Sequence, residues 1–392
     1  MTAEQNILID ALCVAVAGKP RQISAQADWQ ALLQLAANHG LLPLLCDGLQ
    51  KTPEVWAQVP AQAQNPLFSA YMQAIYKETQ QNYTCQQLTQ QLTQAQIPHI
   101  FLKGSVLRYS YPVPALRTMS DLDVLVYAKD FDGIDQVAKQ LGGKTIPGDG
   151  NHRNYYFPGQ VAVEFHPNLL HHATPIGTDI NPGWQYAVES EDFTKQLSPE
   201  GVYLNTICHM ADHFVAGGVG VRFVLDVWVN RHLHKPEMDR AFVEAELERF
   251  GILNFARNIE DLADAWFGDL PMTPVLEELA EYIFTSGSHG TTDQAMLNAL
   301  SLSPGGSRAG ALWKKVFYPK AELEDRFPWC AGKPLLLPVA WCCRAYKAVT
   351  VNGKLILQWS KETGSYSKEQ VDENREMLRR FGISKDHKGG KL

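Results

Sequence analysis

The stretch FLKGSVLRYSYPVPALRTMSDLDVLV, residues 101–126, decides the fold, and its last six residues carry the strongest pattern. Leu122 to Val126 predict a buried strand, because apolar side chains dominate this segment. Asp121 and Asp123 lie two positions apart, so on a strand both carboxylates project from the same face. Two carboxylates on a buried strand repel each other and are costly to desolvate unless a cation joins them. The pair therefore predicts a site for a hard divalent ion such as Mg²⁺, with Mn²⁺ as a substitute.

A second strand is predicted just upstream, over residues 99–102, and a turn follows it at once. Lys103, Gly104 and Ser105 form this turn and open a short predicted helix. Backbone N–H groups at the start of a helix favour an anion, and glycine lets a phosphate approach the backbone closely. A phosphate cradle beside a carboxylate pair is the equipment for phosphoryl or nucleotidyl transfer.

Residues downstream of the carboxylate pair complete a small α/β unit. A helix is predicted over residues 129–141 and ends at a Gly-Gly pair. Two paired strands follow over 153–157 and 160–166, around a Pro-Gly turn. Together with the upstream strands, these elements define a predicted core over about residues 98–170.

The remainder of the sequence predicts helices on both sides of this unit. Apolar residues recur at helical spacing in residues 1–97, and helical patterns return over residues 171–384. Residues 286–310 are rich in Gly and Ser and are predicted to form a loop within the second helical region. The basic tail, residues 385–392, is predicted to be disordered. The expected fold class is α+β, mostly helical, with a small mixed sheet.

Composition limits the classes of function. The chain has 392 residues, of which 45% are hydrophobic and 20% charged, and this profile excludes disorder as the main state. The net charge of −7 argues against a long nucleic acid as a partner, because such binding needs a basic surface. The seven cysteines include no CxxC spacing, and we interpret them as reduced thiols.

No membrane partner and a cytoplasmic location are expected. The first residues lack the positive charge and the uninterrupted apolar stretch of a signal peptide. No run reaches about 18 apolar residues, the length that a membrane-spanning helix requires. Trp and Leu side chains gather over residues 334–359. A membrane-surface helix is one interpretation of this segment, but packing against the core explains it more simply.

These motifs together resemble a known group of enzymes. Gly-Ser followed by Asp-x-Asp on the next strand resembles the nucleotidyltransferase superfamily whose catalytic core is like that of DNA polymerase β. More specifically, LKGSVL, YPVPALRTMSDLDVLV and VEFHPNLL, followed by a helix with His209 and His213, resemble the bacterial uncharacterised nucleotidyltransferase family. The pattern W-x-x-LL-x-LA-x-x-HG at residues 29–40 fits this family too, so the similarity covers most of the chain. The resemblance implies a polymerase β-like core between helical regions.

The resemblance also implies a third carboxylate on a later strand. Glu164 in VAVEFH is the natural match, because Val163 and Phe165 point to the opposite face of that strand. Asp121, Asp123 and Glu164 would then hold the metal, and Glu164 is the candidate base for the incoming hydroxyl. The alternative for Glu164 is a strand glutamate that faces solvent.

Several side chains near the carboxylates have both a functional and a structural interpretation. Gly104 and Ser105 would cradle the β- and γ-phosphates of a nucleotide. Lys103 would contact the triphosphate, or its aliphatic stem would cover the end of the strand. Arg117 would pair with phosphates through its planar guanidinium, or it would compensate the local acidic charge. Ser120 would hold a phosphate oxygen, or it would cap a turn.

Histidines cluster after the last strand of the core and on a later helix. His166 ends this strand, His171 and His172 follow shortly after, and His209 and His213 share one face of the helix. We expect His166 and one of the helical pair to line the pocket. For His209 the alternative is packing beneath the sheet. A zinc hydrolase built on these histidines is a different class of enzyme, but the sequence has no HExxH motif.

Arg222 and Asp226 lie four residues apart on a predicted helix. This spacing is typical of an ion pair on the helix surface, which contributes only about 0.2–0.5 kcal/mol. A role in the pocket is the alternative interpretation for Asp226.

The sequence as a whole predicts a metal-dependent nucleotidyltransferase. Such an enzyme moves an NMP group from an NTP to an acceptor hydroxyl and releases pyrophosphate. The acidic balance favours a small molecule or a peptide as the acceptor. A non-catalytic module that binds a nucleotide or a partner through the same fold is the alternative, and the zinc hydrolase is the third hypothesis. The sequence makes no prediction of oligomeric state.

Overall fold

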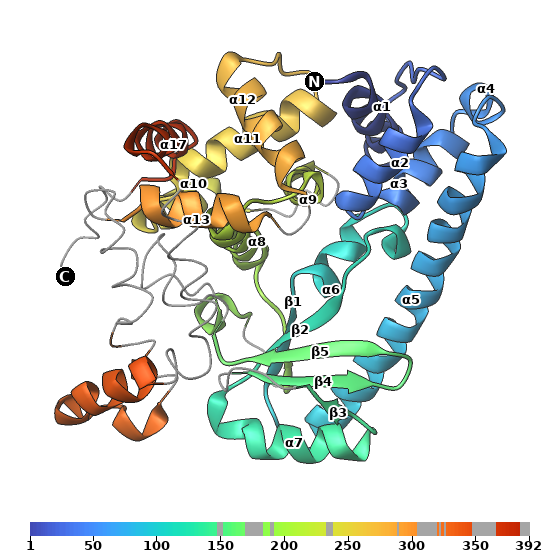
Figure 1. Cartoon of the computed structure of the whole chain (residues 1–392). Helices are drawn as coiled ribbons and strands as arrows, with labels where there is room; N and C mark the ends of the chain where they lie inside the picture. Colours follow the sequence, from blue (N-terminus) through green and yellow to red (C-terminus); the bar gives the residue numbers. More distant parts are fainter. Residues whose placement is uncertain are drawn as a thin grey trace.

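A six-stranded mixed sheet carries the residues of the predicted core (Figure 1). Its strands are β1 (His99–Leu102), β2 (Asp121–Leu125), β3 (Lys144–Thr145), β4 (Arg153–Phe157), β5 (Val161–His166) and β6 (Thr194–Lys195), in the spatial order β3-β4-β5-β2-β1-β6. β2 pairs with β5 in parallel and with β1 antiparallel. β4 is antiparallel to both β3 and β5, and β6 lies parallel to β1. The sheet therefore takes in one strand that follows residue 170.

The structure, a computed structural model, describes residues 1–146, 152–168, 183–188, 192–232, 238–287, 290–303, 320, 323–324, 327–346 and 366–384. The predicted disordered tail, residues 385–392, lies outside the described residues, as do His171 and His172.

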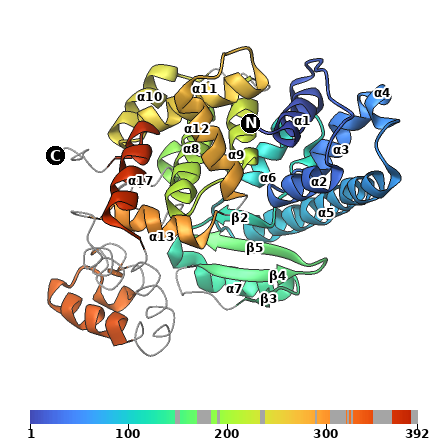
Figure 2. The same ribbon diagram turned by 45° about the horizontal axis from the view of Figure 1, so that its top comes forward.

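Alternation along β2 and β5 gives the sheet two different faces. The apolar positions of one set are buried in a core with α5 (Ala61–Gln94) and α7 (Phe131–Gln140), and Figures 1 and 2 show these helices against the sheet. The residues of β2 and β5 in this core are Leu122, Val124, Val161, Val163 and Phe165, and Val126 just after β2 joins them. The intervening positions, which include Asp123 and Glu164, project from the other face because side chains alternate along a strand.

The helices from the two ends of the sequence form one shared hydrophobic core. The N-terminal group consists of α1 (Ala3–Leu12), a π-helix (Cys13–Ala17), α2 (Trp29–Asn38), α3 (Leu42–Gln50) and α4 (Pro53–Trp56). The C-terminal group consists of α8 (Pro199–Ala216), α9 (Val221–His232), α10 (Arg240–Arg249), α11 (Leu253–Phe267) and α12 (Pro274–Ser286). The fold class is α+β and mostly helical, which confirms the prediction.

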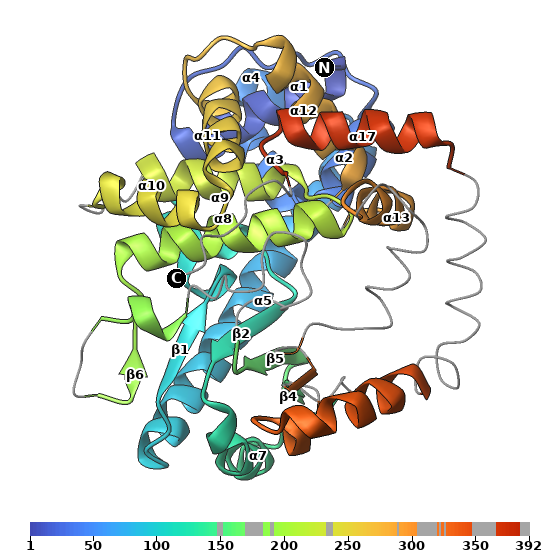
Figure 3. The ribbon, with the colours of Figure 1, turned by 90° about the vertical axis from the view of Figure 1, so that its left-hand side faces the viewer.

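The helical core lies next to one end of the sheet. Figure 3 shows α8 and α9 beside β1 and β2, and Figure 1 shows the same neighbourhood from another side. The short helix α6 (Gly104–Leu107) follows β1 directly. The face of the sheet that α5 and α7 leave uncovered is therefore bordered by α6 and α8.

One expectation for the C-terminal region is wrong in part. The predicted loop over residues 286–310 contains a helix, α13 (Thr292–Ser301), which packs with α17 (Lys368–Arg380) through Met296, Leu300 and Val371. Gly287 and Gly290 precede the helix, and its sequence TDQAMLNALS keeps an apolar face, whereas residues 288–289 and 304–310 lie outside the described residues. No helix in the described part of the chain is long and apolar enough to cross a membrane.

Candidate functional site

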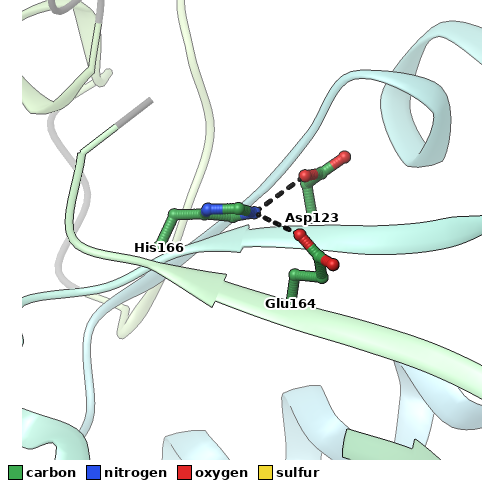
Figure 4. A group of neighbouring side chains, drawn as sticks. All are labelled: Asp123, Glu164 and His166. Atoms are coloured by element: carbon green, nitrogen blue, oxygen red, sulfur yellow. Dashed lines mark hydrogen bonds and ion pairs between the residues drawn. The ribbon is translucent and has the colours of Figure 1, made fainter. Parts of the chain in front are cut away.

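Three side chains from β2 and β5 form a group that could hold a metal ion. One ligand atom each of Asp123, Glu164 and His166 lies within 4.8 Å of the others, and Figure 4 shows the three side chains pointing toward one another. The strand register explains this arrangement, because Asp123 pairs with Glu164 and Leu125 pairs with His166 across the parallel strands. In the described residues, this is the one group of three or more potential ligands so placed.

Asp123 is buried and is bound by two cationic or potentially cationic groups. The Nζ of Lys103 lies 2.7 Å from its Oδ1, and the Nε2 of His166 lies 2.9 Å from the same oxygen. Burial by itself would raise the pKa of Asp123, but Lys103 and then His166 outweigh burial and hold this pKa well below its usual range. Asp123 is therefore a carboxylate at every pH at which the protein is expected to work.

Glu164 differs from Asp123 although the two face each other. Burial raises its pKa, the charge of His166 opposes this effect, and the nearby Asp121 and Asp123 add to it. The Nε2 of His166 lies 3.4 Å from the Oε2 of Glu164. A divalent ion between the carboxylates would relieve their repulsion, so the pair of acids fits a cation.

Asp121 begins β2 and shares the face of Asp123, but it stands outside the group of three ligands. Its Oδ1 accepts a hydrogen bond of 2.8 Å from the Oγ of Ser120. Ser120 is exposed and Asp121 is half-buried, so both lie at the solvent side of the site. Asp121 acts on the pKa of Glu164, which places its charge close to the other two carboxylates.

Lys103 has a backbone conformation that is rare for a residue with a side chain. Its φ is 51° and its ψ is −123°, at the junction of β1 and α6. Such a conformation costs on the order of 1–3 kcal/mol and persists where the surroundings enforce it, often at functional sites. Here it accompanies the short ion pair between the Lys103 ammonium group and Asp123.

Gly104 and Ser105 are buried, and the structure gives each a packing role. A Cβ on Gly104 would lie 2.4 Å from the Nη1 of Arg117 and 2.9 Å from the Sδ of Met119, so a larger residue there would displace these side chains. The Oγ of Ser105 donates a hydrogen bond of 2.6 Å to the carbonyl oxygen of Leu102. The predicted phosphate contacts of Gly104 and Ser105 stay predictions.

Arg117 is buried and forms a bidentate ion pair with Asp226 of α9. Its Nε and Nη2 donate to the two carboxylate oxygens at 3.1 and 2.6 Å, and the hydroxyl of Tyr111 donates to Asp226 at 2.7 Å. Burial alone would lower the pKa of Arg117, but Asp226 outweighs burial and raises it. Asp226 thus binds Arg117, whereas Arg222 donates from Nη1 to the carbonyl oxygen of Thr118 at 3.0 Å.

Helix α8 presents a group of titratable residues to the site. The rings of His209 and His213 lie 4.4 Å apart, and both lie near Phe223 of α9. Burial, with further contributions from Lys103 and His213, lowers the pKa of His209 well below its usual value, so this ring is neutral. His209 is close enough to Lys103 and Asp123 for both charges to act on it. The predicted role of His209 in substrate binding stays a prediction.

Asp212 is a residue that sequence reasoning missed. Burial raises its pKa to about 7, and Lys103 partly opposes that rise. It lies in HMADHF, three residues after His209 and therefore on the same side of α8. An acidic residue between two histidines that share a helical face was the available signal.

Comparison with known proteins gave one match. A family model described as uncharacterised nucleotidyltransferase matches residues 25–268. This range includes the whole sheet, helices α8 and α9, and every residue of the candidate site. No curated protein and no solved structure matches the chain.

Proposed function

This chain belongs to the uncharacterised nucleotidyltransferase family, and we propose that it moves an NMP group from an NTP to an acceptor hydroxyl with the aid of Mg²⁺ or Mn²⁺. The observation that carries this proposal is the convergence of Asp123, Glu164 and His166 on one face of the sheet, within 4.8 Å of one another. Asp121 adds a third carboxylate on the same face. A strand register that places acids opposite each other is costly for the fold unless a cation joins them.

The chemistry of the ligand set fits a divalent cation. Asp121, Asp123 and Glu164 would hold the ion through carboxylate oxygens, which Mg²⁺ prefers, and the imidazole of His166 makes Mn²⁺ a good substitute. When bound, such an ion stabilises negative charge on the transferring and leaving phosphate groups. Every contact recorded for Asp123 in the described part of the chain goes to Oδ1, which leaves Oδ2 for the metal.

The side chains of the site would also accept the proton of the acceptor hydroxyl and neutralise charge on the phosphates. The acceptor oxygen attacks the α-phosphorus, the bond from that phosphorus to the bridging oxygen breaks, and pyrophosphate leaves with the bonding electrons. Glu164 is the candidate base for the hydroxyl proton, and its raised pKa favours this role. Lys103 would offset charge on the phosphates. The predicted nucleotide contacts of Gly104, Ser105 and Ser120 belong to the same proposal.

The acceptor is proposed to be a small molecule or a peptide and to bind between the sheet and α8. His209 lies near Lys103 and Asp123 and is neutral, so it is suited to hydrogen bonding with an uncharged acceptor group. The net charge of −7 disfavours a long nucleic acid, and a cytoplasmic location agrees with this substrate class.

A thermal-shift experiment tests the binding site. With Mg²⁺ and each of the four common NTPs, at least one NTP is expected to raise Tm, because a ligand that binds the folded state stabilises it. The double variant Asp121→Asn with Asp123→Asn is expected to lose that shift. Asp269→Asn is a matched control, because Asp269 is exposed and pairs only with Lys19 in the described residues. Full metal-dependent NTP binding by the double variant would refute the site.

A labelling experiment tests the reaction. Incubation with an NTP labelled at the α-phosphate and with cell extract is expected to label an acceptor, whereas a γ-labelled NTP leaves it unlabelled. Transfer from the γ-label instead would indicate a kinase. Binding of the NTP without any transfer would support the non-catalytic module, and stoichiometric zinc in the purified protein would support the zinc hydrolase.

A further inference from the structure

A second group of cations lies at the Asp121 side of the site. Arg222 near the start of α9 and Lys77 of α5 come from opposite ends of the matched region, yet the charge of Asp121 acts on both. Lys77 and Arg222 also act on each other, because Arg222 lowers the pKa of Lys77. Both side chains are thus close enough to Asp121 for its charge to act on them. The hydrogen bond from Arg222 to the carbonyl oxygen of Thr118 fixes its guanidinium group three residues before Asp121.

Arg222 carries a charge that no carboxylate neutralises directly. In the described residues, the ion pairs and hydrogen bonds recorded for it include only the 3.0 Å bond from its Nη1 to the carbonyl oxygen of Thr118. Burial is the main cause that lowers the pKa of Arg222, and the neighbouring Arg117 adds to it. The other cations of the site are matched, Arg117 by Asp226 and Lys103 by Asp123. Arg222 is half-buried, and Asp226 and Asp121 favour its charge, but the described residues include no ion pair between either carboxylate and Arg222. A partly buried guanidinium group with no directly bonded counter-ion is costly unless a ligand supplies the negative charge.

The N-terminal segment of the matched region holds Arg222 in place. The Nδ1 of His39 accepts a hydrogen bond of 3.3 Å from the backbone N–H of Val221, the first residue of α9. Gly40 has a φ of +66°, and a Cβ there would lie 3.2 Å from the Nη1 of Arg222. The carbonyl oxygen of Gly40 accepts a hydrogen bond of 3.2 Å from the Oγ1 of Thr118. His39, Gly40 and Thr118 thus support the start of α9 and one edge of the guanidinium group.

We propose that Arg222, together with Lys77, binds the triphosphate of the nucleotide substrate, and that His39 and Gly40 position Arg222 for this contact. This inference rests on the proposed function and deepens it. It gives the phosphate tail a side-chain site beside Asp121, where the guanidinium fork matches phosphate oxygens. It also explains the His39-Gly40 pair of the pattern at residues 29–40, because both residues help to position Arg222. By contrast, a Cβ on Gly104 would meet Arg117 and Met119, and the hydroxyl of Ser105 donates to the carbonyl oxygen of Leu102.

Calorimetric titration with Mg²⁺ and either inorganic tripolyphosphate or the four NTPs tests this inference. Arg222→Met is expected to weaken binding of tripolyphosphate and of the best NTP about tenfold to a hundredfold, as loss of a charge-assisted contact does. Lys77 is more exposed, so Lys77→Met is expected to weaken both about threefold to tenfold and leaves folding intact. Affinity for Mn²⁺ alone should not fall in either variant, because the carboxylates are untouched and the loss of a nearby positive charge favours a cation.

Two further variants separate positioning from folding. Arg222→Lys keeps the charge and is expected to recover part of the affinity that Arg222→Met loses. Gly40→Ala is expected to weaken phosphate binding in the wild-type background and to have no further effect on it in Arg222→Met, because the two residues act through one contact. Lys139→Met of α7 is the matched control, since this exposed lysine belongs to a helix on the opposite face of the sheet.

The outcomes distinguish this inference from the proposed function. If the wild-type protein binds neither tripolyphosphate nor any NTP, the proposed function fails and this inference fails with it. If the wild-type protein binds an NTP and both Arg222→Met and Lys77→Met bind it within twofold of wild type, only the inference fails.

Discussion

Two buried aspartates of this protein, Asp123 and Asp226, are both held by cations but in different ways. Asp226 receives two hydrogen bonds from Arg117, one on each oxygen, and a third from Tyr111. Asp123 receives Lys103 and His166 on a single oxygen, Oδ1. The carboxylate at the helix junction is therefore bonded on both oxygens, whereas all contacts of the sheet carboxylate with the described residues fall on one oxygen.

The difference shows how one residue type serves two purposes. At Asp226, the bidentate ion pair with Arg117 and the third donor Tyr111 hold the carboxylate firmly. This pair links the segment that precedes β2 to α9. A lysine on one oxygen is a replaceable counter-ion, because a divalent ion can take over the neutralisation that Lys103 provides. A buried ion pair by itself is thus weak evidence of a site, and the pattern of occupied oxygens is the informative feature.

The largest expected effect is on the aspartate that is bonded on both oxygens. Asp226→Asn leaves Arg117 buried without its counter-ion, so the free energy of unfolding should fall by about 3–5 kcal/mol. Urea denaturation measures this loss, and Asp269→Asn at an exposed position should change stability by less than about 1 kcal/mol. Near-equal stability of the Asp226 and Asp269 variants would mean that the Arg117 pair does not hold the junction together.

Removing Lys103 tests the replaceable pair. Lys103→Met leaves Asp123 with His166 alone, so the metal-free protein should lose about 2 kcal/mol of unfolding free energy. Saturating Mn²⁺ should restore most of this loss, because the ion neutralises Asp123 directly. The same addition should restore little in Asp226→Asn. Equal responses of the two variants to Mn²⁺ would remove the distinction between the two aspartates.

Asp212 extends the comparison to an aspartate for which burial is the main influence. Its pKa is raised to about 7 from an ordinary value of 3.8. Between about pH 4 and pH 7 the folded protein holds this proton and the unfolded chain has lost it, so stability falls as pH rises through that window and levels off above it. Asp212→Asn should remove this slope, so its stability advantage over wild type should grow from pH 5 to about pH 7 and stay constant above that. The Tm of both proteins, measured as a function of pH, tests this expectation. The same pH dependence in wild type and variant would mean that Asp212 does not have a raised pKa.

The smallest effect is expected at the third donor to Asp226. Tyr111→Phe removes one hydrogen bond and leaves both contacts from Arg117, so the unfolding free energy should fall by about 1 kcal/mol. A double-mutant cycle with Asp226→Asn should show that the two losses are not additive. Additive losses would mean that the hydroxyl of Tyr111 stabilises the protein through some other group.

The sequence predicts those parts of the fold that depend on residues close together in the chain. The apolar run in DLDVLV predicted one strand and the pattern around the Pro-Gly turn predicted the other, over VAVEFH. In the structure, the register of these strands places Asp123 opposite Glu164. The partner of Asp226 could not be predicted in this way, because Arg117 lies 109 residues away and Arg222 is the nearer candidate in sequence. Gly104 shows another limit: the sequence predicted that a phosphate approaches the backbone there, and only packing shows that Arg117 and Met119 lie where a Cβ would be. Asp212 was not predicted as a site residue, because its raised pKa depends on burial that the sequence does not show.

Helix α5 has a mechanical consequence for the whole molecule. Its 34 residues form a rod of about 50 Å at 1.5 Å per residue. Leu67 and Ala74 lie in the core of the helical regions, whereas Leu88 and Leu92 lie in the core of the sheet. One continuous helix is thus packed into both hydrophobic cores, that of the helical regions and that of the sheet. The two cores cannot move apart independently unless α5 bends or slides. We therefore expect substrate entry to depend on movements of loops and side chains, while the two cores keep their relative positions.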